Sequence, residues 1–119
     1  MVTIRQHGSN GELFDISSFL TDIDRFVRPD TWTIVIDECI GDRAVEIEQL
    51  SSSGHTLSDS AFRSLYHDIF QTIDGHFVVL SGGEPVLELL AVDSFFWEIS
   101  GTPAFESHML ANYGAWQRA

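Results

Sequence analysis

The stretch "VIDECIGDRAVEIE", residues 35–48, decides the predicted fold. Apolar and polar residues alternate on both sides of Gly41 and Asp42. Alternation with a period of two is typical of half-buried strands, and glycine at the first central position suits a two-residue type II′ turn. The sequence therefore predicts a β-hairpin, with one strand at 31–38 and the other at 44–50.

The predicted hairpin carries its acids on the face opposite its apolar residues. Asp37 lies opposite Glu46 and diagonal to Glu48, with Glu38 and Asp42 towards the turn. A three-residue loop would change this arrangement. Like charges that face each other across two strands destabilise the pair by about 0.2 to 1 kcal/mol, so folding gains nothing from it. Two explanations stay open: a docking face for a basic partner, or a solvated face that guards the ribbon's edge.

Three segments are predicted to be helices. Apolar residues recur at i, i+3, i+4 and i+7 over 15–27, where Asp15 is a favourable N-cap, and again over 61–73. The last segment starts with Thr102 as N-cap and Pro103 at the first helical position.

The remaining segments complete a mainly antiparallel sheet. Strands are predicted at 2–6, 76–81, 86–92 and 95–100, with a short extended piece at 12–14 and a loop at 51–56. By composition alone, 86–92 could also be helical. The order of hairpins and helices predicts a single α+β domain over residues 1–119, with about three helices packed on the sheet.

The charge of the chain limits its partners. Eighteen acidic residues stand against six basic ones, all arginine, and give a formal charge of −12. We therefore expect no direct binding to nucleic acid or to an anionic membrane, and a basic protein as partner. No segment approaches the roughly 20 apolar residues of a membrane span, and the single cysteine, Cys39, allows no internal disulfide. The expected location is the cytoplasm.

The sequence contains no recognisable catalytic or metal-binding motif. The glycine-rich segment 81–85 lacks the P-loop pattern, and Cys39 has no local signature of a nucleophile. The histidines show no metal-ligand spacing; they are His7, His55, His67, His76 and His108. We expect no enzymatic activity, no metal and no cofactor.

The aromatic segment "DSFFWEIS" at 93–100 places bulky residues on both faces of one predicted strand. Such a strand lies either in the middle of the fold or beneath a partner. Trp97 is mainly expected in the core, and it is also a candidate anchor of an interface, because buried tryptophans often dominate binding energy.

A small, acidic, lysine-free α+β chain with the acidic stretch "IDECIGDRAVEIE" resembles, in its general type, bacterial immunity proteins that neutralise a toxin by occupying its active site. The resemblance implies an inhibitor whose carboxylates meet the basic groove of a nuclease or similar toxin. The alternatives are a phage-type inhibitor of a defence system that mimics nucleic acid, and a small-ligand-binding domain. The candidate contact residues are Asp37, Glu38, Asp42, Glu46, Glu48 and Trp97.

Overall fold

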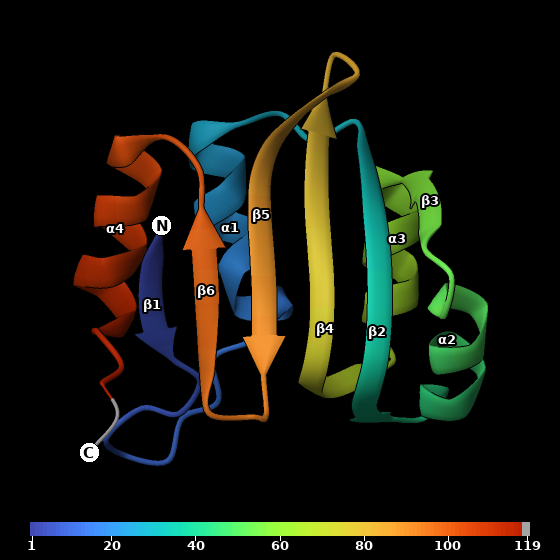
Figure 1. Cartoon of the computed structure of the whole chain (residues 1–119), viewed down its shortest axis with the longest axis horizontal. Coiled ribbons are helices and arrows are strands. Elements are labelled where there is room, and N and C mark those ends of the chain that lie inside the picture. The colour runs from blue at the N-terminus through green and yellow to red at the C-terminus, as the bar shows by residue number, and fades with distance from the viewer. Residues whose placement is uncertain (118–119) are drawn as a thin grey trace.

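A six-stranded sheet forms the centre of the computed structural model, which describes residues 1–117 (Figure 1). Every strand pair is antiparallel, and the order across the sheet is β1-β6-β5-β4-β2-β3. In chain order the elements are β1 (Val2–Arg5), α1 (Ile16–Phe26), β2 (Thr31–Gly41), α2 (Ala44–Ser51), β3 (His55–Ser58), α3 (Asp59–Tyr66), β4 (Ile69–Ser81), β5 (Glu84–Val92), β6 (Phe96–Ser100) and α4 (Pro103–Tyr113). The predicted α+β class is confirmed, with four helices in the described chain instead of about three.

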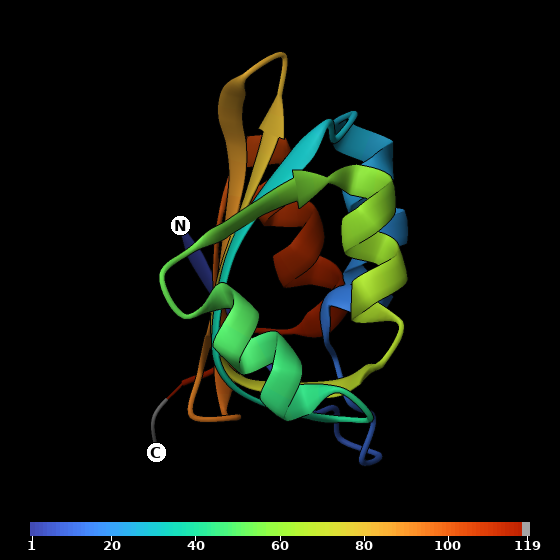
Figure 2. The same cartoon turned by 90° about the vertical axis from the view of Figure 1, so that its right-hand side faces the viewer.

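The helices α1, α3 and α4 lie on one face of the sheet and leave the other face uncovered (Figure 2). Every second residue of the central strands is buried against these helices, as expected for a sheet with one solvated face. The fully buried core includes Trp32, Ile34 and Ile36 of β2, Phe77 and Val79 of β4, Leu89 of β5, Trp97 and Ile99 of β6, and Phe19, Ile23, Phe62, Phe105 and Met109 of the helices.

The first and last helices form as predicted, because their capping residues satisfy backbone groups that have no partner within the helix. The Asp15 carboxylate accepts a hydrogen bond from the Ile16 amide at the start of α1. The Thr102 hydroxyl accepts one from the Phe105 amide at the start of α4, and Pro103 occupies the first turn.

The predicted hairpin is wrong, because residues 44–51 form the helix α2 and β2 pairs with β4 instead. The residues of "AVEIEQLS" that face the core also fit a helical period, since Ala44, Ile47 and Ser51 are three and four residues apart, Ile47 and Ser51 are buried, and Ala44 packs against the core. Glycine is required at position 41 because the backbone there passes close to the start of β4, and not because it forms a turn. A Cβ atom there would lie 2.2 Å from the backbone oxygen of Asp68.

The predicted helix over 61–73 is too long. The structure ends α3 at Tyr66 and begins β4 at Ile69, and the strand tolerates the β-branched residues Ile69, Thr72 and Ile73 better than a helix does. The predicted loop at 51–56 includes the start of β3, and the predicted extended piece at 12–14 makes only an isolated bridge between His7 and Leu13.

The C-terminal segment covers the outer edge of β1. The Arg5 amide donates to the Gly114 oxygen at 3.2 Å, and the Trp116 amide donates to the Thr3 oxygen at 3.0 Å. This pairing removes an edge at which another chain could add a strand.

β3 pairs with β2 only as far as Ile34, and side chains of α2 cover the outer edge of β2 after this point. The Ile36 amide donates to the Ser51 hydroxyl at 3.0 Å, and the Cys39 amide donates to the Glu48 carboxylate at 3.0 Å. The helix therefore satisfies backbone groups that would otherwise need a neighbouring strand. These stretches of edge are therefore closed to an added strand.

Candidate binding surface

The face of the sheet turned away from α1, α3 and α4 is called the open face below. Its central side chains are half-buried or exposed, while their neighbours along each strand are buried. It consists of Thr3 and Arg5 of β1, Thr33, Val35 and Asp37 of β2, His76 and Val78 of β4, Val86, Glu88, Leu90 and Val92 of β5, and Phe96, Glu98 and Ser100 of β6.

One row of the open face crosses four strands. Val35 is paired with His76, His76 with Leu90, and Leu90 with Glu98. Side chains directly opposite each other in an antiparallel pair are about 4.5 to 5.5 Å apart at Cβ. The row therefore places His76 between Val35 and Leu90, with the Glu98 carboxylate beside Leu90.

The next row repeats this mixture. Thr33 is paired with Val78, Val78 with Glu88, and Glu88 with Ser100. The Nε2 atom of His76, in the first row, lies 2.8 Å from Oε1 of Glu88. The two rows together form a continuous surface of aliphatic side chains interrupted by acids.

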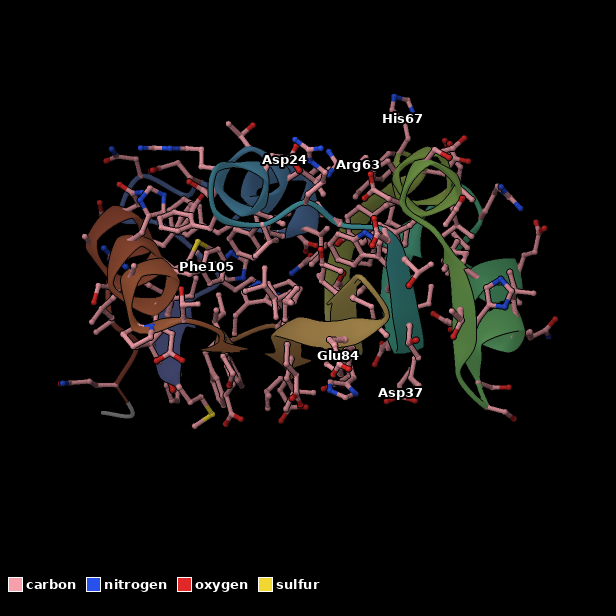
Figure 3. The ribbon with its side chains drawn as sticks, turned by 90° about the horizontal axis from the view of Figure 1, so that it is seen from above. Asp24, Asp37, Arg63, His67, Glu84 and Phe105 are labelled. Carbon is pink, nitrogen blue, oxygen red and sulfur yellow. The ribbon has the colours of Figure 1, made fainter. Side chains whose placement is uncertain are left out.

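The charge on this face is mainly negative. Asp37, Glu88 and Glu98 contribute carboxylates from three strands, while Arg5 lies at the β1 end and donates from Nε to the Tyr113 oxygen at 3.1 Å. Viewed from above, Asp37 and the hairpin residue Glu84 both project from the side of the sheet opposite the helices (Figure 3).

Three of the predicted contact residues are exposed and make no side-chain hydrogen bond or ion pair among the described residues. Asp37 lies on the open face. Glu38 stands opposite Asp74, where the β2–β4 ladder is irregular, and Asp42 lies in the turn before α2. The structure therefore brings two acids together at Glu38, but across β2 and β4 and not within the predicted hairpin.

The other two predicted carboxylates have partners within the chain. Glu46 lies on α2, 2.6 Å from the Arg43 guanidinium, whose hydrogen bonds and charge lower the pKa of Glu46. Glu48 accepts the Cys39 amide, as described above. Neither lies opposite Asp37, since the hairpin that would have brought them there does not form.

Trp97 belongs to the core. Its side chain is fully buried, its Nε1 donates to the Phe14 oxygen at 3.0 Å, and its ring packs edge-to-face on Phe19 at a centroid distance of 5.3 Å. A partner that docks on the surface would not reach it. The core interpretation of Trp97 therefore holds, and the anchor hypothesis is not supported.

Sequence reasoning missed Glu88 and Glu98. The alternation in "VLELLAV" and "FFWEIS" already places both carboxylates opposite buried residues. The three strands were predicted to follow one another in the sheet, but the sequence does not contain the pairing of β4 with β2, which places Glu88 and Glu98 on the same face as Asp37. Their shared surface emerges only from the strand order.

A buried polar cluster joins α1, α3 and β4 in the interior. The Asp15 carboxylate accepts the Thr72 amide at 2.8 Å and the Thr72 hydroxyl at 3.0 Å, and the Tyr66 hydroxyl lies 2.6 Å from that of Thr72. Burial raises the pKa of Asp15 to about 6, against the opposite effect of its hydrogen bonds. Asp15 is only 2% exposed, so the cluster is out of reach of a partner or substrate and serves the packing of the fold.

A hollow of about 440 Å³ between α1 and α3 contains charged groups that bind one another. Arg63 lies 2.6 Å from Asp24 and 3.0 Å from Asp59. Trp32 donates from Nε1 to Asp59 at 2.8 Å. These pairs tie the two helices to β2, whereas Arg28, which also lines the hollow, makes no ion pair among the described residues.

A second cluster holds α1 to α4. The Asp22 carboxylate lies 2.7 Å from Nε2 of His108 and accepts a hydrogen bond from the Tyr113 hydroxyl. Burial and the neighbouring Asp22 carboxylate raise the pKa of Tyr113, so the phenol stays protonated. No nucleophilic side chain is hydrogen-bonded to this cluster within residues 1–117, and it connects the two helices.

The described residues contain no group of three or more potential ligands that could hold a metal ion. Burial and the nearby Glu48 carboxylate raise the pKa of the Cys39 thiol to about 11, which makes it a poor nucleophile at neutral pH.

Within residues 1–117, no helix is both long enough and apolar enough to span a bilayer.

Comparisons of the chain with protein-family models, with curated proteins and with solved structures find no match.

Proposed function

We propose that this protein is a non-catalytic inhibitor that docks its open face onto a basic protein, and that its target is a toxin domain such as a nuclease. The observation that carries the proposal is a sheet face that no helix covers, on which Asp37, Glu88 and Glu98 alternate with aliphatic side chains. In this proposal the protein acts in the cytoplasm as an immunity protein.

The two components of the open face have different roles. The aliphatic residues supply area whose removal from water favours binding, at roughly 25 cal/mol per Å². The carboxylates, and the net charge of −12 behind them, attract a basic partner and speed its approach. Carboxylates can also take the place of phosphates beside the basic side chains of a nucleic-acid-binding groove. An acidic surface blocks a nuclease in this way.

The charge also argues against a second copy of this chain as the occupant. Two open faces brought together would oppose Asp37, Glu88 and Glu98 with the same three carboxylates, between chains of formal charge −12. Like charges placed against each other in an interface oppose association. A basic partner removes that cost.

The test is an affinity capture from a lysate of the native host at low salt, followed by washes of rising salt and mass spectrometry. The variant Asp37→Lys with Glu88→Lys reverses two charges on the open face. The control variant, Glu12→Lys with Glu46→Lys, makes the same change in net charge at two exposed positions away from this face.

The proposal predicts that wild type and control retain the same basic protein, while the open-face variant does not. If the captured protein is a toxin domain, the result supports an immunity protein. If it is a protein of a defence system, the same surface inhibits a different target. Loss of capture in both variants, or in neither, contradicts docking through the open face. Retention of no basic protein contradicts the proposed function.

A further inference from the structure

A hollow of about 170 Å³ lies on the open face where β6 ends. β6 stops at Ser100 and the chain turns at Gly101 towards α4, while the β4–β5 hairpin continues beyond that point (Figure 1). Pro85 lies on the part of β5 that has no β6 partner, where its lack of an N–H group costs no ladder hydrogen bond. The hollow is several times larger than the roughly 30 Å³ that a water molecule occupies in the liquid.

The hollow is lined by both aliphatic and polar residues. Val78, Pro85 and Val86 line it with aliphatic side chains, while the Leu87 side chain belongs to the core. Glu88 and Ser100, which also line it, are cross-strand partners, so their Cβ atoms lie about 4.5 to 5.5 Å apart. Oε1 of Glu88 is engaged with His76, whereas Oε2 has no hydrogen-bond partner among the described residues.

We propose that this hollow receives an arginine side chain of the basic partner; the inference rests on the proposed function and names the chemistry of its central contact. The methylene groups of an arginine pack on aliphatic walls while its charged end stays accessible. Its planar guanidinium then donates in parallel to the free Glu88 oxygen and to the Ser100 hydroxyl. A lysine offers one compact charge and lacks the fork that matches two adjacent acceptors.

The experiment titrates the ¹⁵N- and methyl-labelled protein with the tripeptide acetyl-Gly-Arg-Gly-amide. Matched peptides replace the arginine with lysine or with citrulline, which keeps the shape and removes the charge. Glu88→Gln removes the carboxylate of the hollow. The control Glu84→Gln removes an equal charge from the neighbouring hairpin, outside the hollow.

We expect saturable shifts of the Val78 and Val86 methyl signals with the arginine peptide and none with citrulline. Glu88→Gln should weaken the binding at least about threefold, as expected for loss of an accessible ion pair, and Glu84→Gln should leave it unchanged. The lysine peptide should bind more weakly than arginine. Equal binding of lysine and arginine, equal effects of the two variants, or shifts spread evenly over the open face would overturn the inference.

The peptide titration and the lysate capture fail independently. If the open face retains a basic protein but the arginine peptide does not enter the hollow, the arginine contact is wrong and the proposed function stands. If the peptide binds in the hollow but no basic protein is retained, the arginine site stands and the proposed inhibitor role is wrong.

Discussion

The pH dependence of stability should reveal the buried carboxylate of Asp15. Its pKa is raised from 3.8 to about 6 by burial. In the unfolded chain the group ionises near its ordinary value. Between these two values the folded protein binds more protons than the unfolded chain, so the contribution of Asp15 to stability falls as the pH rises through this window. It is fully present below pH 3.8 and lost above about pH 6.

The size of this effect follows from the shift. A shift of about 2 units at 1.36 kcal/mol per unit corresponds to about 3 kcal/mol, an order-of-magnitude figure for a group that is 2% exposed. The hydrogen bonds from Ile16 and Thr72 stabilise the ionised form, but by less than burial destabilises it. Asp15 therefore destabilises the fold at neutral pH relative to its protonated form.

The assay is urea unfolding of wild type and Asp15→Asn at several pH values between about 4 and 7.5. The unfolding free energy of wild type minus that of Asp15→Asn isolates Asp15, because the other carboxylates are common to both proteins. This difference should fall by roughly 3 kcal/mol across the range and stay level above about pH 6. Glu12→Gln, at an exposed position, serves as the control and should show no such trend.

A difference that stays flat, or that rises with pH, would refute the reasoning. A rise would mean that the three hydrogen bonds to the carboxylate stabilise its ionised form by more than burial destabilises it.

Three further predictions concern β2 and the elements beside it. Glu48→Ala should lower the unfolding free energy by about 1 to 3 kcal/mol, because it leaves the Cys39 amide without its acceptor. The control Glu46→Ala breaks only an exposed ion pair and should leave urea unfolding unchanged. Gly41→Ala should destabilise the protein by about 1 to 3 kcal/mol, since its Cβ would lie 2.2 Å from the Asp68 oxygen; an unchanged thermal midpoint would contradict this close approach. The Cys39 thiol, with its pKa raised to about 11, should react with a thiol-specific reagent at pH 8 far more slowly in the folded than in the urea-unfolded protein, and equal rates would contradict its burial.

The elements that the sequence predicts correctly are those with local signals. The helix α1 begins after Asp15 and α4 after Thr102, and in each case the capping side chain that indicates the start in the sequence makes the expected hydrogen bond. The strands β5 and β6 follow from alternation in "VLELLAV" and "FFWEIS". Caps and periodicity are properties of a few neighbouring residues, so they can be read from one segment alone.

The fold of residues 44–51 could not be predicted in this way. The segment satisfies a strand period through Val45 and Ile47 and a helical period through Ile47 and Ser51. The choice depends on β4, which begins at Ile69 and takes the place beside β2 that the predicted hairpin had given to this segment. Such long-range competition has no local signal.

The candidate surface shows the same limit. Asp37 was predicted from its alternation with Ile36 and lies exposed, as expected. The partners assigned to it, Glu46 and Glu48, depended on the hairpin and are engaged elsewhere. Glu88 and Glu98 join Asp37 on one face only because β4 and β5 separate β2 from β6.

The most direct test of docking through the open face is the association rate of the captured basic partner as a function of salt concentration. The account predicts that the wild-type rate is high at low salt and falls steeply as salt is added. Asp37→Lys with Glu88→Lys should associate much more slowly at low salt, with the two rates converging at high salt, while Glu12→Lys with Glu46→Lys stays closer to wild type. A control that slows association as much as the open-face variant, or a rate that does not depend on salt, would contradict the account.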